Sequence, residues 1–152
     1  IAEIYNQGIE DRIATFETTP RTADDVARWF DGVHPVVVVC ADHEGRVVGF
    51  AATSEYRPRA CYGGIAEFSV YVTRDYRGRG IGRLALGALI DEAGKAGLHK
   101  LVSRIFPENV ASRAACRAAG FREVGTYKEH GQLEGVWKDC VIVERVVRTC
   151  GD

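Results

Sequence analysis

The sequence lacks any imbalance of charge that would direct it to a charged macromolecule. Its 152 residues include 20 Lys and Arg against 21 Asp and Glu, a formal net charge of −1. No overall attraction to nucleic acid or to a membrane surface is therefore expected. No apolar run approaches the ~20 residues that a membrane-spanning helix needs. We predict that neither nucleic acid nor a membrane is a partner.

The chain also lacks the cysteine and histidine spacings of metal and redox centres. No Cys-x-x-Cys pair occurs among its five cysteines, which are Cys40, Cys61, Cys116, Cys140 and Cys150. Four scattered histidines show no metal-ligand spacing either. Cys40 and Cys140 adjoin valine-rich runs and are expected to be buried. These features predict no bound metal and a reducing, cytoplasmic location.

Length and periodicity predict a single α/β domain over residues 1–152, with a mixed central sheet flanked by helices. The expected helices are residues 1–10, Thr22 through Phe30, Gly80 to about Ala96, and a helix capped by Asn109 that runs through Ala119. The third should bury Ile81, Leu84, Ala85, Ala88 and Leu89. The expected strands are Val36–Cys40, Arg46–Ser54, Ile65–Val72, Lys100–Phe106, Phe121–Lys128 and Val136–Val147, the last two joined by a loop from His130 to Gly135.

The most informative segment is a glycine- and arginine-rich turn between a strand and a helix. It reads Arg74-Asp75-Tyr76-Arg77-Gly78-Arg79-Gly80-Ile81-Gly82, with Arg83 following. Glycines allow close approach of the backbone, and the free amides and dipole of a helix N-terminus favour an anion. A Walker A loop fits poorly, because it ends in Gly-Lys-Ser/Thr and this chain has Gly82-Arg83-Leu84. The dinucleotide-binding motif fits poorly too, because its glycines are spaced G-x-G-x-x-G and these are spaced G-x-G-x-G. A pyrophosphate-bearing ligand is predicted, and a turn that binds nothing is the alternative.

Two ordered motifs carry a resemblance to a known family. Arg77-x-x-Gly80-x-Gly82, followed downstream by Asn109-Val110-Ala111-Ser112 and Gly120-Phe121, resembles the acetyl-CoA-binding segments of the GNAT superfamily of N-acetyltransferases. The resemblance implies the GNAT acyl-CoA N-acyltransferase fold and acetyl-CoA as co-substrate. The cofactor contacts that it implies are Val70, Tyr71, Val72, Arg77, Gly78, Arg79, Gly80, Ile81, Gly82, Asn109 and Ser112. Because such proteins usually have a strand before the first helix, we expect natural residues upstream of Ile1.

Glu67 is the predicted catalytic residue. Strand alternation places it on one face with Ser69 and Tyr71, opposite Ala66, Phe68, Val70 and Val72. A carboxylate there can remove the proton of an ammonium group before acetyl transfer. The alternative for Glu67 is a cross-strand ion pair. Where many family members carry a tyrosine general acid, this chain has Cys116; its thiol could serve, but packing is the favoured interpretation.

A closer resemblance concerns the acceptor. Arg57, Arg59 and Tyr62 ahead of Glu67, together with Phe16 and the later Gly135-x-Trp137-x-Asp139, resemble the phosphinothricin N-acetyltransferase group. Relatives in that group acetylate arsinothricin and methionine sulfoximine or sulfone. The resemblance implies a small glutamate-like amino acid as substrate, a resistance or detoxification role and a homodimer. Arg57 and Arg59 would hold substrate anions, Phe16 and Tyr62 would line the pocket, and Glu134 matches more loosely.

Two other functions stay open at this stage. The first is acetylation of another amine, such as a protein N-terminus or a polyamine; the two arginines of the loop disfavour a polyamine. The second is a catalytically silent acetyl-CoA-binding module. Glu67 and the intact cofactor motifs argue against that second alternative.

Overall fold

A computed structural model describes residues 1–147, so Cys150 lies outside the described residues. The helices are α1 (Ala2–Asp11), α2 (Ala23–Ala27), α3 (Ile81–Lys95) and α4 (Val110–Ala118). The strands are β1 (Val36–Cys40), β2 (Val47–Glu55), β3 (Ile65–Val72), β4 (Lys100–Ile105), β5 (Arg122–Leu133) and β6 (Val136–Val146). Short 3₁₀ turns occupy Ala60–Tyr62 and Arg74–Tyr76. Among residues 1–147, no helix is long and apolar enough to cross a bilayer.

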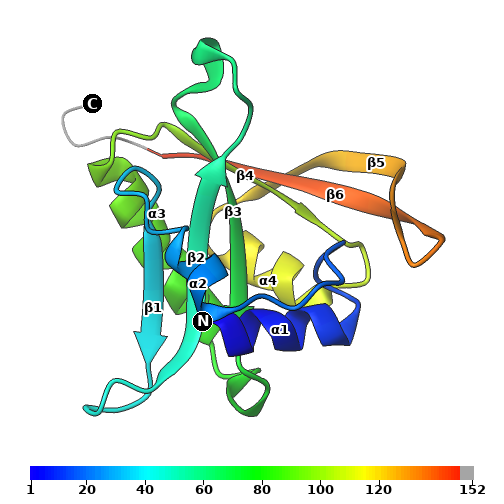
Figure 1. Ribbon diagram of the computed structural model, residues 1–152. Coiled ribbons are helices and arrows are strands. Elements are labelled where there is room, and N and C mark those ends of the chain that lie inside the picture. Colours follow the sequence, from blue (N-terminus) through cyan, green and yellow to red (C-terminus); the bar gives the residue numbers. More distant parts are fainter. Residues whose placement is uncertain (148–152) are drawn as a thin grey trace.

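The six strands form one mixed sheet in the order β1-β2-β3-β4-β6-β5. Only β3 and β4 run parallel; the other neighbours are antiparallel. Helices α1 and α2 cover one face, and α3 and α4 cover the other (Figure 1). The mixed sheet flanked by helices confirms the predicted architecture.

Each face of β3 packs against a different core, as strand alternation predicts. Ala66 and Phe68 pack with the buried leucines of α3. Tyr71 faces the other way, against Phe50 and the residues of α1. Helix α1 lies close to Tyr71 because Gly8 has no side chain; a Cβ there would come within 2.7 Å of the tyrosine ring.

The sheet opens between β3 and β4. The two strands pair only where Ile65–Glu67 lie beside Lys100–Val102. Further along, the hydroxyl of Ser103 donates to the carbonyl of Phe68 at 2.8 Å. A strand edge without a neighbouring strand leaves peptide groups free to bind an extended ligand. This separation positions the candidate site.

The predictions for helix α2 and for Cys40 were wrong in part. The helix ends at Ala27 rather than Phe30, and the chain continues through i→i+3 bonds to Phe30. Asp31 then accepts hydrogen bonds from the amides of Val33 and His34, which competes with further helix. Cys40 is exposed because it ends an edge strand, where the register shifts.

The buried face of α3 matches the prediction only in part, at Ala85 and Leu89. The residues that it buries are Ala85, Leu86, Leu89 and Ala93. Leu84 is 60% exposed. The apolar residues are spread over more than half of the helix surface. Periodicity alone therefore could not identify which side of the helix packs on the sheet.

The loop predicted between the last two strands is mostly strand. Strand β5 continues to Leu133, and only Glu134 and Gly135 form the turn. Both have positive φ, 50° and 80°, the arrangement of a tight two-residue hairpin. Irregular pairing between Tyr127 and Gly131 bends the hairpin.

Candidate active site

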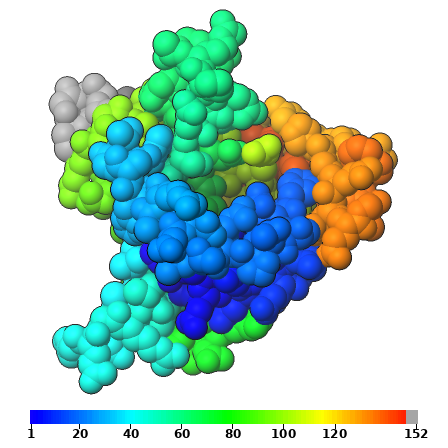
Figure 2. Space-filling view, viewed as in Figure 1, coloured from blue at the N-terminus to red at the C-terminus, as the bar shows by residue number. Residues whose placement is uncertain are grey.

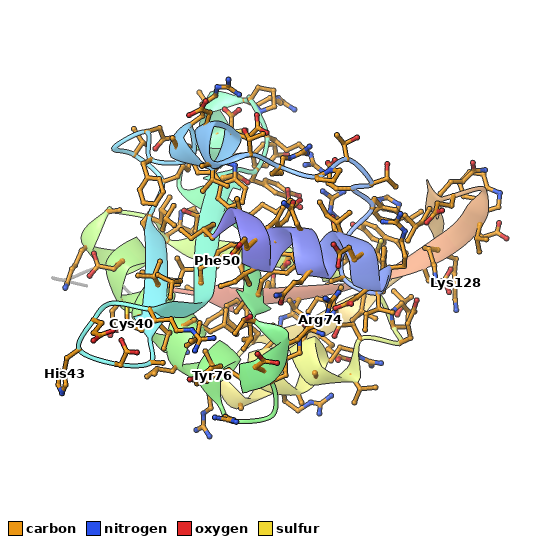
Figure 3. All side chains as sticks on the ribbon, turned by 60° about the horizontal axis from the view of Figure 1, so that its bottom comes forward. Cys40, His43, Phe50, Arg74, Tyr76 and Lys128 are labelled. Atoms are coloured by element: carbon orange, nitrogen blue, oxygen red, sulfur yellow. The ribbon has the colours of Figure 1, made fainter. Side chains whose placement is uncertain are left out.

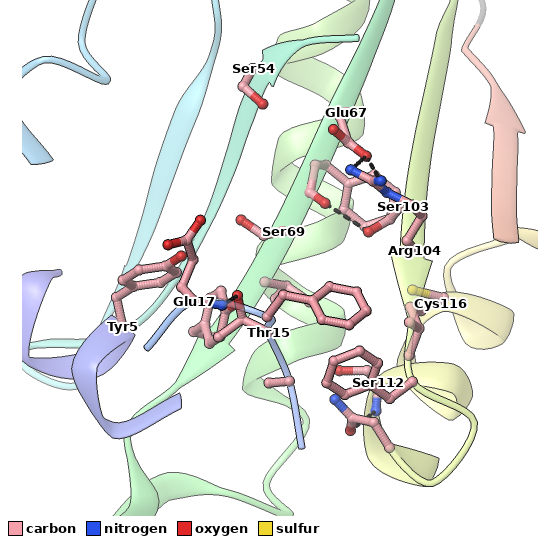
Figure 4. A pocket seen from close by; sticks show the side chains of 18 residues that line it. Tyr5, Thr15, Glu17, Ser54, Glu67, Ser69, Ser103, Arg104, Ser112 and Cys116 are labelled. Carbon is pink, nitrogen blue, oxygen red and sulfur yellow. Dashed lines mark hydrogen bonds and ion pairs between the residues drawn. The ribbon is translucent and has the colours of Figure 1, made fainter. Parts of the chain in front are cut away.

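A cleft of about 340 Å³ lies where β3 and β4 separate (Figure 4). Strands β2, β3 and β4, helices α1 and α4 and the segment 14–17 all contribute to its lining. In Figure 2 the surface is hollowed between residues of the N-terminal segment, the 56–64 loop and the β5–β6 hairpin. The cleft thus passes between strands and reaches both faces of the sheet.

Glu67 lines this cleft and forms an ion pair with Arg104 of β4. One carboxylate oxygen, Oε1, accepts from Nε of Arg104 at 2.9 Å and lies 2.8 Å from a terminal guanidinium nitrogen. The side chains are 22% and 40% exposed, respectively. Glu67 therefore faces the cleft and also takes part in the cross-strand ion pair, and its catalytic role stays a prediction.

Aromatic side chains form one wall of the cleft. Phe16 lines it as predicted and packs edge-to-face on Phe106, with ring centroids 4.8 Å apart. Gly131 gives Phe16 room, because a Cβ at that position would lie 2.7 Å from the ring. Tyr5 and Tyr71 form a second edge-to-face pair. Burial raises the pKa of both tyrosines, so both keep their protons.

Sequence reasoning missed two charged residues of the cleft, Glu17 and Arg104. Glu17 pairs with Arg21 at 2.8 Å. A signal for Arg104 was present: in β4, alternation separates Lys100, Val102 and Arg104 from the buried Leu101, Ser103 and Ile105. Only knowledge that β4 neighbours β3 could have placed Arg104 beside Glu67.

The loop of residues 56–64 holds its arginines outside the described lining of the cleft. The guanidinium of Arg57 lies 4.4 Å from the ring centroid of Tyr56, and that of Arg59 lies 6.0 Å from the ring of Tyr62. The structure does not bring these arginines, or Tyr62, together with Glu67. Glu134 lies at the β5–β6 turn and pairs with Arg12.

The predicted anion-binding turn leads into α3 as expected. Gly80 is the N-cap, with a φ of 78° and no side-chain cap. Gly78 has the same φ, and a Cβ at either glycine would meet nothing within 4 Å. The first amides of a helix have no partner within it, so this N-terminus suits a pyrophosphate.

Two of the four arginines near this turn instead hold it to α1. Arg74 pairs with Glu10 and Asp11 at 2.9 and 2.8 Å, and Arg77 pairs with Asp11 at 2.8 Å. Figure 3 shows Arg74 beside α1. Burial would raise the pKa of Asp11, but the hydrogen bonds from both arginines outweigh it and lower that pKa. Arg79 stacks over the ring of Tyr76 at 4.7 Å.

The prediction places the pantetheine arm between this turn and the cleft. A Cβ on Gly82 would lie 3.8 to 4.0 Å from Val72, Val70 and Ala115, so Gly82 faces side chains of both β3 and α4. Asn109 caps α4 by accepting from the amide of Ser112 at 3.3 Å, as predicted. The predicted cofactor residues that line the cleft are Val70, Tyr71, Asn109 and Ser112. These residues fit an extended phosphate-bearing group.

Cys116 lies at the bottom of the cleft and is only 1% exposed. Burial, with a smaller effect of Glu123, raises the pKa of its thiol to about 12. Proton transfer from such a thiol to a thiolate of ordinary basicity, with a conjugate-acid pKa of ~8.5, is unfavourable. The structure therefore favours packing for Cys116. Within residues 1–147, no group of three or more His, Cys, Asp or Glu side chains is arranged to hold a metal ion.

Comparison with known proteins identifies the class. Residues 2–121 match the model of the acetyltransferase (GNAT) family. The chain therefore belongs to the GNAT family, and it is an acetyl-CoA-dependent acetyltransferase.

Three proteins of this family are similar to the chain over most of its length. An L-methionine sulfoximine/L-methionine sulfone acetyltransferase from Pseudomonas paraeruginosa is 35% identical, over 95% of this chain and 86% of the relative. A crystal structure of a phosphinothricin acetyltransferase from Sinorhizobium meliloti in complex with acetyl-CoA has a TM-score of 0.87 and 30% identity, over 99% and 84% of the two chains. A ribosomal-protein-alanine N-acetyltransferase from Brucella melitensis has a TM-score of 0.86 and 36% identity, over 95% and 91%.

Proposed function

We propose that this acetyltransferase modifies the α-amino group of a small glutamate-like amino acid, such as arsinothricin, phosphinothricin or methionine sulfoximine, and so confers resistance to it. The observation that carries this proposal is Glu67, a carboxylate on a cleft of about 340 Å³ whose lining also includes Asn109 and Ser112, two of the predicted cofactor residues. The sulfoximine and phosphinothricin relatives support the amino-acid class.

In the proposed mechanism, acetyl-CoA supplies an acetyl group activated as a thioester. Glu67 accepts a proton from the acceptor's ammonium group and leaves a neutral amine that can attack. The free peptide N–H groups on the β3 edge around Val70–Val72 stabilise the negative charge that develops on the carbonyl oxygen. The C–N bond forms, the nitrogen loses its remaining extra proton to solvent, and the C–S bond breaks. Solvent protonates the departing thiolate, because Cys116 retains its own proton.

The acceptor's distal head is assigned to the loop of residues 56–64. Arg57 and Arg59 would turn from their aromatic neighbours to the anionic head, with Tyr62 beside them. Phe16 lines the cleft already, and Glu134 lies at the hairpin turn, where it pairs with Arg12. The exposed position of the two arginines leaves them free to move without disturbing the core.

The principal rival is acetylation of a protein N-terminus, which the ribosomal-protein-alanine relative favours. A panel of acceptors separates the two. We expect turnover of acetyl-CoA with phosphinothricin, arsinothricin or methionine sulfoximine, and little turnover with a peptide that begins with alanine. Release of free CoA thiol measures the rate. Acetylation of the peptide alone would overturn the proposed substrate class.

Arg59→Ala is expected to weaken capture of an anionic head more than capture of a neutral one. Loss of a charge-assisted contact costs ~2–4 kcal/mol, or tens- to hundreds-fold in kcat/KM. Phosphinothricin carries an anionic phosphinate, whereas methionine sulfone has a neutral head, so the sulfone should lose much less. Steady-state kinetics on both acceptors test this, with Arg57→Ala as the parallel variant. Unchanged kcat/KM on phosphinothricin in both variants would leave the loop with no role in binding.

We also propose a cytoplasmic homodimer that associates through the β5–β6 hairpin. Four apolar residues of the hairpin, Val124, Tyr127, Val136 and Trp137, are about half exposed, and exposed apolar side chains suit an interface. The four described cysteines are free thiols, which suits a reducing compartment. A solution mass equal to that of a single chain would contradict the dimer.

A further inference from the structure

We propose that Arg104 binds the α-carboxylate of the acceptor and thereby selects free amino acids over amines and peptide N-termini. This inference rests on the proposed function, because it concerns the same cleft and the same acceptor. Arg104 would bind the carboxylate next to the reacting amine, whereas Arg57 and Arg59 would bind the anionic head at the other end of the acceptor.

The first support is the position of Arg104 relative to the predicted base. Its guanidinium lies 2.8 to 2.9 Å from Oε1 of Glu67, and both side chains line the cleft. In a free amino acid, the ammonium and the carboxylate are attached to the same carbon. An acceptor whose ammonium reaches Glu67 therefore carries its carboxylate into the space next to Arg104. The adjacent anion and cation of the cleft match the two charges of a zwitterion (Figure 4).

The second support is the charge distribution in the cleft. Among the described lining residues, Arg104 is the one cationic side chain, and Glu17 and Glu67 are the two acidic ones. Glu17 is already neutralised by Arg21. Arg57 and Arg59 lie on rings of their own loop, outside the lining. Among the described lining residues, Arg104 is therefore the cation that can neutralise a carboxylate bound near Glu67.

The pair is also able to exchange partners. A fully buried ion pair is costly to break, but this one is partly exposed, and such pairs contribute little net stability. When the acceptor binds, its carboxylate replaces Glu67 at Arg104, and its ammonium replaces Arg104 at Glu67. No charge is left unpaired, and the Glu67 carboxylate is released to accept a proton. An acceptor without a carboxylate leaves Glu67 held by Arg104.

The test compares one acceptor in two forms, methionine sulfone and its α-carboxamide, in wild type and Arg104→Gln. For the variant we expect about a 10- to 100-fold loss of kcat/KM on methionine sulfone, mainly through KM. On the carboxamide we expect no loss, or a gain, because Glu67 is free. Arg104→Lys, which keeps the charge but not the planar fork, should recover part of the selectivity.

The matched control is Arg122→Gln, which breaks another cross-strand arginine–glutamate pair, with Glu144, away from the cleft. It should leave both acceptors unaffected, and acetyl-CoA affinity should be unchanged in all variants. Equal losses on the two acceptors in Arg104→Gln, or no loss on either, would overturn the role of Arg104. Wild-type protein that acetylates no free amino acid would instead overturn the proposed function, before any variant is measured.

Discussion

Glu67→Gln is expected to lower kcat about 10²-fold or more near pH 7. Glutamine keeps the shape of the side chain and its place in the cleft, but it cannot accept the ammonium proton. Both ligands should still bind, so the loss should appear in kcat rather than in the affinity for acetyl-CoA. Steady-state and single-turnover rates with methionine sulfoximine measure it.

The pH dependence distinguishes a base from a positioning group. As the pH rises, a larger fraction of the amine arrives already deprotonated, so the deficit of Glu67→Gln should shrink. A deficit that stays constant across pH would mean that Glu67 only positions the ammonium. Glu123→Gln is the matched control, because it breaks the Arg113–Glu123 pair on α4 and β5 outside the cleft. If Glu67→Gln kept the wild-type kcat, Glu67 would have no role as a base, and its role would be limited to the ion pair with Arg104.

Gly82→Val is expected to weaken acetyl-CoA binding about 100-fold, or ~2.8 kcal/mol. The new Cβ would lie at ordinary contact distances from Val70 and Val72 of β3 and Ala115 of α4. The two methyl groups beyond it would fill the space where the pantetheine arm is predicted to bind. The fold should tolerate it, because Gly82 is a helical residue and valine is no worse a helix former than glycine. Calorimetric titration with acetyl-CoA measures the affinity.

The control for this variant lies on the same helix. Gly87→Val places the same side chain where a Cβ meets nothing within 4 Å, so acetyl-CoA affinity and thermal stability should both be kept. Gly80→Val is less informative, because the φ of 78° at Gly80 adds backbone strain to any effect on the ligand. Full acetyl-CoA affinity in a folded Gly82→Val protein would remove the turn-to-cleft path from the binding site.

Local signals explain the predictions that were confirmed. Strand β3 has the predicted bounds, Ile65–Val72, because its alternation is unbroken between two glycines and a polar turn. Asn109 caps α4 because an asparagine side chain bonds a backbone amide three residues on. The predicted loop from His130 to Gly135 contains the Glu134–Gly135 turn, but the loop was predicted too long. A polar residue such as Gln132 is typical of a loop, but here it is a strand residue because it pairs with β6.

The class of protein could be predicted from local sequence, because the glycine- and arginine-rich turn, the helix that follows it and the Asn109 segment are each specified by neighbouring residues. Which charged side chains pair with one another depends on the tertiary structure. Arg104 reaches Glu67 across 37 residues of chain through the pairing of β3 with β4, and Arg74 and Arg77 are held by Asp11 of α1 rather than left for an anion. A charged side chain forms an ion pair with an oppositely charged side chain that the fold brings within about 4 Å. That distance depends on strand order and helix packing, which local sequence does not encode.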